Sequence, residues 1–130
     1  MASAHEHLAK WRHNRQFLDT IQQDCYADWM VTVAFYAAVH CVESLLAKDK
    51  ISHGMTHEGR NDCLKRNNRY KKIWENFRPR YEASMVARYL CYNGKSCPSF
   101  DQWMNVDDIK TRLIAGNLCE VEKSVTKLSI

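Results

Sequence analysis

Residues 26–48 read YADWMVTVAFYAAVHCVESLLAK, and this stretch decides the fold class. It is long enough for roughly six helical turns. Apolar side chains fall on almost every side of such a helix, which is typical of a helix buried at the centre of a bundle. Asp28 lies in the expected first turn and Lys48 in the last, where the helix dipole favours their charges. We therefore expect a central buried helix around which the rest of the chain packs.

The rest of the chain also favours helices over strands. Only 4 Gly and 2 Pro occur in 130 residues, whereas a many-stranded sheet needs frequent turns. Besides residues 26–48, we expect a helix over about 5–23 and another from His57, capped by Thr56, to about 67. A further helical region covers about 70–92, where Pro79 opens or kinks a helix. The last helix is expected to run from Asp101 or Asn105 to the C-terminus. The sequence predicts one domain over residues 1–130, an all-α, up-and-down bundle of about five helices.

Composition and cysteine spacing predict a cytoplasmic protein. A formal net charge of +4 permits contact with nucleic acid without requiring it. The N-terminal residues lack the apolar segment of a signal peptide, and we expect no membrane association because no apolar run of transmembrane length lacks a polar break. The 6 cysteines are irregularly spaced, so we expect reduced thiols. Cys91 and Cys97 flank a loop, where a local disulfide or half of a metal site is the alternative.

His40 is the first polar residue that departs from the apolar pattern. It lies within the most apolar segment of the chain, and Glu43 follows one turn later on a shared face. A buried carboxylate needs a cation or hydrogen-bond donors, or it takes up a proton. The sequence leaves two interpretations open, a structural pair that fixes the helix register and a functional pair.

A second polar group lies in SHGMTHEGRNDCL, residues 52–64. His57, Arg60, Asn61 and Leu64 recur at helical spacing on one face. Leu64 turns this face toward the core, so His57 and Arg60 border the core, and Arg60 is the expected partner of Glu43.

We expect no metal and no cofactor in this stretch. His53 and His57 have the HxxxH spacing, but that spacing aligns two metal ligands only on a continuous helix. Gly54 and the expected cap at Thr56 place His53 in the connector before the helix.

A third polar group lies in YEASMVARY, residues 81–89. Tyr81, Ser84 and Arg88 recur on one side of the expected helix, with Tyr89 adjacent. We expect Arg88 to meet Glu43 or a bound anion, or alternatively to lie over an aromatic ring at the surface. The three groups together predict a common pocket. An imidazole beside a fixed guanidinium charge suits work at a phosphodiester, the histidine exchanging a proton and the arginine holding the phosphate.

Two stretches carry a family resemblance. Residues 32–61, TVAFYAAVHCVESLLAKDKISHGMTHEGRN, followed by YEASMVARY, resemble a bacterial and archaeal group of small HEPN-like helical proteins. In that group a helix reading roughly FYAAVHxVEAxLA leads to a Ser- or Thr-initiated HxxRN stretch and then to a Y…S…ARY helix, and the match spans about residues 29–92. The resemblance implies a four- or five-helix up-and-down bundle, often paired as a homodimer.

The wider HEPN superfamily implies an RNA-related function. It includes metal-independent ribonucleases of toxin–antitoxin, anti-phage and CRISPR systems, and also non-catalytic modules that bind RNA or nucleotides. Its catalytic members carry a histidine shortly after an Arg and polar pair. Arg60 and Asn61 resemble that pair, but the positions where the histidine would follow hold Lys65, Arg66 and Asn67. A catalytic histidine would therefore be His57 or His40.

Three functions remain open from the sequence. The first is a ribonuclease that uses His57 or His40 with Arg60. The second is a non-catalytic module that binds RNA, a nucleotide or a partner protein, helped by the basic run KRNNRYKK (65–72), in which Tyr70 is a candidate for stacking on a base. The third is a structural clamp with no open cleft. The expected site residues are, for catalysis, His57, Arg60 and His40 and, for binding, Glu43, Asn61, Tyr81, Ser84, Arg88 and Tyr89.

Overall fold

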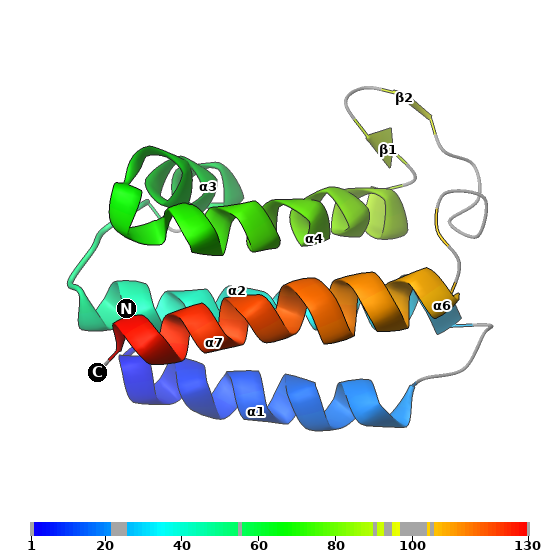
Figure 1. The fold of residues 1–130 in the computed structure, drawn as a ribbon, viewed down its shortest axis with the longest axis horizontal. Coiled ribbons are helices and arrows are strands. Elements are labelled where there is room, and N and C mark those ends of the chain that lie inside the picture. The colour runs from blue at the N-terminus through cyan, green and yellow to red at the C-terminus, as the bar shows by residue number, and fades with distance from the viewer. Residues whose placement is uncertain are drawn as a thin grey trace.

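The computed structural model describes residues 2–21, 26–54, 56–89, 91–92, 95–96, 104 and 106–129. Over these ranges the protein is all-α, with five helices packed together (Figure 1). They are α1 (Ala4–Thr20), α2 (Ala27–Lys48), α3 (His57–Arg66), α4 (Lys71–Tyr89) and a final helix made of α6 (Val106–Asp108), η3 (Ile109–Leu118) and α7 (Cys119–Leu128). The predicted all-α class and the five packed helices are confirmed.

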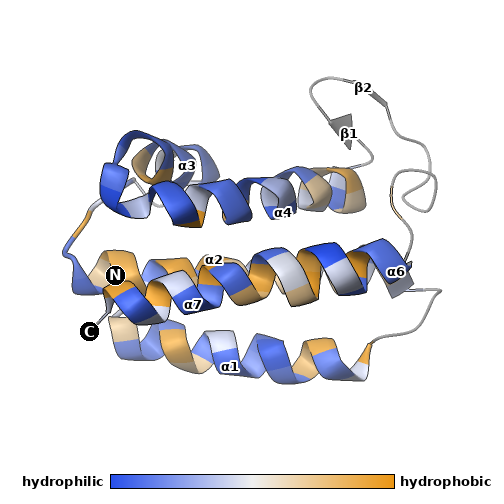
Figure 2. Cartoon of the chain, in the orientation of Figure 1, coloured by the Kyte–Doolittle hydropathy of each residue, from blue (hydrophilic) through white to orange (hydrophobic). Residues whose placement is uncertain are grey.

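The central element is α2, as its sequence predicts. It contacts α1, α4, η3 and α7, and its side chains from Met30 to Leu46 supply much of the core. Hydrophobic segments recur along α2, whereas α3 and α4 present mainly hydrophilic segments outward (Figure 2). By length and composition α2 also qualifies as a membrane span, although most of it is buried among the other helices, and core helices of soluble proteins pass the same test.

The start of α3 matches the prediction from the sequence. Thr56 adopts an extended backbone, and its hydroxyl accepts a hydrogen bond of 2.9 Å from the backbone N–H of Gly59. The helix ends at Arg66, and a short 3₁₀ turn, η2 (Asn68–Tyr70), leads into α4. The break expected around Asn67 is therefore present.

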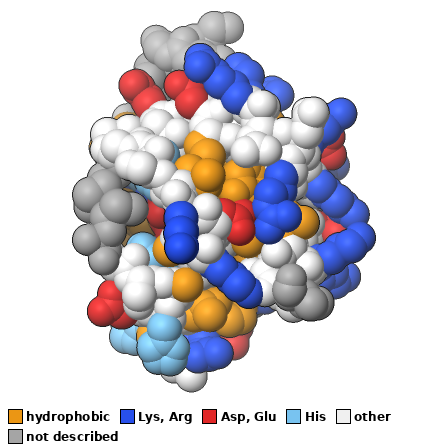
Figure 3. All heavy atoms as spheres, turned by 90° about the vertical axis from the view of Figure 1, so that its left-hand side faces the viewer, with side chains coloured by type: hydrophobic (Ala, Val, Ile, Leu, Met, Phe, Trp, Pro, Cys, Tyr) orange, Lys and Arg blue, Asp and Glu red, His pale blue; other side chains and the backbone are white. Residues whose placement is uncertain are grey.

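The basic run 65–72 does not offer Tyr70 to a ligand. Tyr70 is only 1% exposed, and its hydroxyl donates to the carboxylate of Asp49. The prediction that Tyr70 stacks on a base is wrong, because the 3₁₀ turn points the ring into the core. The Lys and Arg side chains of the run remain exposed, and basic residues are spread over the upper and right parts of the face of the molecule shown in Figure 3.

Two elements differ from the expected helix boundaries. Pro79 lies inside α4, which continues as one helix through the proline, and Phe77 and Arg80 on either side of it are both buried in the core. The final helix carries a π-helical stretch, η3, that no feature of the sequence predicted. Asp101 and Asn105, the expected starts of that helix, lie outside the described residues.

The segment after α4 contains a small antiparallel pair, with β1 (Cys91–Tyr92) at the end of the expected helix and β2 (Lys95–Ser96) where we expected a loop. The thiols of Cys41, Cys63 and Cys119 are free, as predicted for these three. Cys25, Cys97 and the side chain of Cys91 lie outside the described part of the structure, so the state expected of them stays a prediction.

Candidate functional site

Glu43 is the junction of the site. It lies on the last part of α2 and is only 8% exposed. Arg60 of α3 donates through Nε to Oε1 at 2.6 Å, and His53 in the connector before α3 places Nε2 at 2.7 Å from the same oxygen and 3.0 Å from Oε2. The Arg60–Glu43 pair predicted from helical spacing is present, and His53 joins it.

Two opposing effects act on the pKa of Glu43. Burial alone would raise it, because the charged form is desolvated. The hydrogen bonds from His53 and Arg60, together with the charge of Arg60, outweigh burial and lower the pKa below its usual value. Glu43 is therefore a carboxylate at neutral pH and neutralises the charge of Arg60.

His57 lies on the other side of Arg60. Its Nδ1 is 3.0 Å from Nη1 of Arg60, and its ring packs at 5.6 Å from Phe35 and 6.1 Å from Tyr81, between ring centres. Burial, then the charges of Arg60 and Arg88, lower the pKa of His57. A guanidinium can only donate, so Nδ1 accepts and the neutral ring carries its proton on Nε2.

Arg88, near the end of α4, is held in a fixed orientation. Its Nη1 donates to the Tyr36 hydroxyl at 3.1 Å, and its Nη2 and Nε donate to the hydroxyl and the carbonyl of Ser84 at 3.2 and 3.3 Å. The guanidinium lies over the rings of Phe35, Tyr36 and Tyr89, at 5.3, 5.6 and 5.0 Å from their centres. Of the two arrangements expected from sequence, the structure shows the arginine over aromatic rings and no contact with Glu43.

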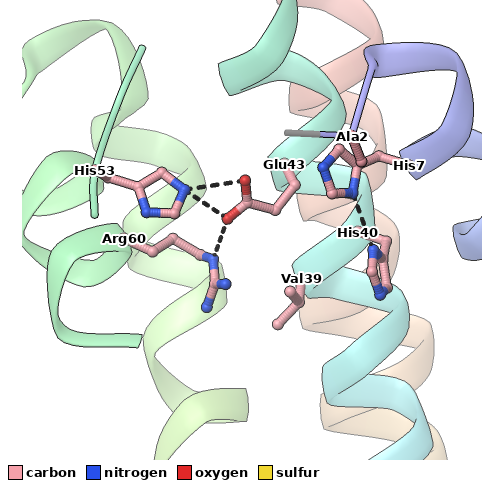
Figure 4. Close-up of a pocket in the computed structure, with 7 residues that line it drawn as sticks. All are labelled: Ala2, His7, Val39, His40, Glu43, His53 and Arg60. Carbon is pink, nitrogen blue, oxygen red and sulfur yellow. Dashed lines mark hydrogen bonds and ion pairs between the residues drawn. The ribbon is translucent and has the colours of Figure 1, made fainter. Parts of the chain in front are cut away.

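An open pocket of about 160 Å³ lies beside the Glu43 junction, between α1, α2 and α3 (Figure 4). It is lined by Ala2, His7, Val39, His40, Glu43, His53 and Arg60. His53 and Arg60 point at Glu43 from one side of α2, while His40 turns to the other side and meets His7 of α1 (Figure 4). The Nδ1 atoms of His7 and His40 are 3.1 Å apart, so one ring donates and the other accepts.

The predicted pairing of His40 with Glu43 is wrong. Residues three positions apart on a helix diverge by roughly 60° around its axis. In this structure that divergence sends His40 toward α1 and Glu43 toward α3. Burial, then the charges of His7, Lys10 and Arg60, lower the pKa of His40, so this ring is neutral at neutral pH.

Of the remaining predicted site residues, some are buried and make contacts within the protein, and one is exposed at the surface. Ser84 is fully buried and bridges Arg88 to the backbone of Tyr81, whereas Tyr81 itself packs its ring against Phe35 and His57. The side-chain oxygen of Asn61 is buried without a partner among the described residues. Tyr89 is 60% exposed and contacts Arg88.

The predicted residues thus form two linked groups instead of one pocket. The Glu43 junction and its pocket form the first group, and the Arg88 cluster with Tyr36, Ser84 and Tyr89 forms the second. His57 and Phe35 connect them, since Phe35 contacts both His57 and Arg88. His57 is therefore flanked by two guanidinium groups.

Four residues of these groups were missed from sequence. His53 was assigned to the connector and left out of the site, although its side chain is only 3% exposed and bonds to Glu43. Tyr36 and Phe35 lie seven and eight residues before Glu43, at spacings that place them near its face of α2. His7 lies on a separate helix, and no local spacing relates it to His40.

The arginine of the first group has an opposite charge beside it, but among the described residues the arginine of the second group does not. Arg60 is paired with Glu43, whereas no carboxylate pairs with Arg88 anywhere in the described ranges. No three His, Cys, Asp or Glu side chains gather as potential metal ligands in these ranges either. The arrangement offers an uncompensated guanidinium, a neutral imidazole that donates through Nε2 and a second guanidinium beside it, which together suit an anionic ligand.

Comparisons with known proteins do not extend this description, because no protein-family model, no curated protein and no solved structure matches the chain.

Proposed function

We propose that this protein is a HEPN-like module that binds RNA through its phosphates, at the His57 side of Arg88. The sequence resemblance over residues 29–92 supports the family, and the all-α bundle of five helices is compatible with it. The geometry supports binding more strongly than catalysis.

The observation that carries the proposal is that the charge of Arg88 is held in place without a negative charge beside it among the described residues. A guanidinium is costly to hold half-buried without an opposite charge. Arg88 is nevertheless fixed by Tyr36 and Ser84 with no acidic partner among the described residues. A phosphate would supply the missing negative charge and would accept from the second N–H of Nη1, since Nη2 also donates to Sδ of Met85.

His57 contributes a donor to such a phosphate. Its Nδ1 is occupied by Arg60, so the ring presents Nε2–H and does not act as a base while that contact persists. A bound phosphate would accept from Nε2–H of the neutral ring, and Nδ1 would keep its contact with Arg60.

Metal-independent RNA cleavage is the second candidate, and one observation favours it. His7 and His40 present ring nitrogens 3.1 Å apart beside the pocket that Arg60 lines, so one ring donates and its neighbour accepts. Such a pair resembles the acid and base that cleavage at a 2′-hydroxyl requires.

The test measures binding of a fluorescently labelled oligoadenylate by anisotropy at low salt. Wild-type protein is expected to bind, with affinity that falls as salt rises. Arg88→Gln is expected to weaken binding about tenfold, since it removes a charge-assisted contact. Tyr36→Phe keeps the ring and removes only the hydroxyl that orients Arg88, so a smaller loss is expected from it.

The matched control is Arg112→Gln, which removes the same charge from the exposed face of η3, where no residue contacts Arg88 or lines the pocket beside Glu43. Equal losses in Arg88→Gln and Arg112→Gln would show nonspecific attraction and overturn the proposal. So would an absence of binding by folded wild-type protein.

The second candidate is tested by incubating RNA with the protein in the presence of a chelator. Cleavage by the wild type that is lost in His40→Ala supports this candidate, and RNA that stays intact with the wild type rejects it.

A further inference from the structure

One end of the bundle carries exposed aromatic side chains. Tyr89 is 60% exposed, and Trp29, Phe17 and Tyr26 are 58%, 49% and 46% exposed. The C-terminal ends of α1 and α4 and the N-terminal end of α2 lie together at the right-hand end of Figure 1. We call these four residues the aromatic end.

Tyr89 differs from the other three residues of the aromatic end because a cation packs against it. The guanidinium carbon of Arg88 lies 5.0 Å from the centre of the Tyr89 ring. Since Tyr36 and Ser84 hold that guanidinium, Tyr89 is backed by a positioned charge while most of its surface stays open to solvent. Arginine planes and exposed aromatic rings are the surfaces on which proteins stack unpaired bases.

We infer that Tyr89 is the stacking platform for an unpaired base of the RNA whose phosphate binds at Arg88, so the ligand class is single-stranded and not duplex RNA. This inference rests on the proposed function. An exposed ring next to a phosphate-binding cation reaches a base only where that base is unstacked, and bases inside a duplex are already stacked on both faces.

A nucleotide fits this surface better than an apolar protein partner. A partner that covered Tyr89 with apolar atoms would also desolvate Arg88, whose charge has no carboxylate beside it among the described residues, and that burial is unfavourable. A nucleotide covers the ring with its base and brings a negative charge for the guanidinium.

The test compares three ligands of equal length: a single-stranded oligoadenylate, the same ribose-phosphate chain without bases, and a duplex RNA. Wild-type protein is expected to bind the oligoadenylate best. Tyr89→Ala is expected to weaken oligoadenylate binding about tenfold, the loss of one stacked base, and to leave binding of the abasic chain unchanged. Tyr89→Phe keeps the ring and is expected to bind as the wild type does.

The control is Phe17→Ala, which removes an exposed aromatic ring of the same end that does not contact Arg88. Equal binding of oligoadenylate and abasic chain by the wild type, or a Tyr89→Ala loss no larger than that of Phe17→Ala, overturns the stacking platform while the phosphate site stands. Tighter binding of duplex than of single strand also overturns it. If the wild type binds none of the three ligands, the proposed function itself fails.

Discussion

Glu43 is the residue on which the site geometry depends. Its carboxylate holds Arg60 and His53 in place, and all three side chains are at least nine-tenths buried. Breaking a buried pair leaves an uncompensated charge in a poorly solvated place, whereas an exposed pair contributes little.

Glu43→Gln is therefore expected to lower the free energy of unfolding by on the order of 3 kcal/mol, measured by urea denaturation. The control is Glu82→Gln, whose pair with Arg78 is largely exposed, and we expect a loss below about 1 kcal/mol there. Similar losses for the two variants would show that the junction is not the buried pair described here.

The pH dependence of stability follows from His57. Its pKa is lower in the folded state than the ordinary value of 6.5, so the unfolded chain binds the proton more readily. Stability is then complete above the unfolded pKa and is lost as the pH falls through 6.5 toward the folded pKa. His40 acts in the same direction, and Glu43 adds a further loss at lower pH, below its own unfolded value.

We expect the melting temperature to fall as the pH is lowered from 7 through this window. His57→Asn keeps an acceptor near Arg60 but does not titrate, so its melting temperature should change less over the same range. A wild-type melting temperature that rises on acidification would contradict the pKa directions given for these groups.

At the scale of elements, the connector before α3 is held against the first turn of that helix. A Cβ at Gly59 would overlap the backbone carbonyl oxygen of His53 and crowd the hydroxyl of Thr56. The absence of a side chain at Gly59 therefore allows the connector to bring His53 to Glu43. The sequence alone predicted the cap at Thr56 but not this close approach, because the approach depends on the path of the backbone six residues earlier, at His53.

Gly59→Ala is expected to destabilise the protein by about 1–3 kcal/mol, since a backbone atom and not a flexible side chain must move. Gly116→Ala is the control, because its Cβ would lie at 3.3 Å from a backbone oxygen and alanine favours a helix. Urea denaturation of both variants is the measurement, and an equal or smaller effect at Gly59 would contradict the account of the connector.

The last helix has features that the local sequence pattern does not predict. Arg80 is 1% exposed, and two of its N–H groups donate to the Leu113 carbonyl in the π-helical stretch η3. Burial lowers the pKa of Arg80 to about 9. Neither the π-helix nor its arginine partner follows from the spacing of apolar residues, and the contact between Arg80 and Leu113 joins two helices that are distant in sequence.

For the whole molecule, the sequence predicted the bundle and most helix positions, since the apolar run of α2 and the cap at Thr56 are local signals. It predicted the Arg60–Glu43 pair because helical spacing places both residues toward the core. It could not predict the His7–His40 contact, nor that Arg88 lies away from Glu43, because both depend on how separate helices pack. The homodimer, the cytoplasmic location and the absence of membrane association stay predictions.

The two ends of the molecule differ in surface chemistry. The exposed basic side chains of residues 65–72 lie at the end where α3 leads into α4, and the aromatic end lies where α4 finishes. The Glu43 junction lies toward the first end, where α2 finishes, and the Arg88 cluster reaches the aromatic end through Tyr89, with His57 and Phe35 connecting the two groups. This arrangement suits an extended, flexible polyanion better than a compact one.

The most direct test of the central claim records the imidazole nitrogen signals of the wild-type protein by NMR during titration with single-stranded oligoadenylate. His13, exposed on α1 away from both groups, serves as an internal reference. We predict that the Nε2 signal of His57 shifts because a phosphate accepts from Nε2–H, while Nδ1, which accepts from Arg60, keeps the signal of an unprotonated nitrogen and the His13 signals do not shift. Binding of the RNA with no change at His57 would contradict the claim that its phosphate is held at the His57 side of Arg88.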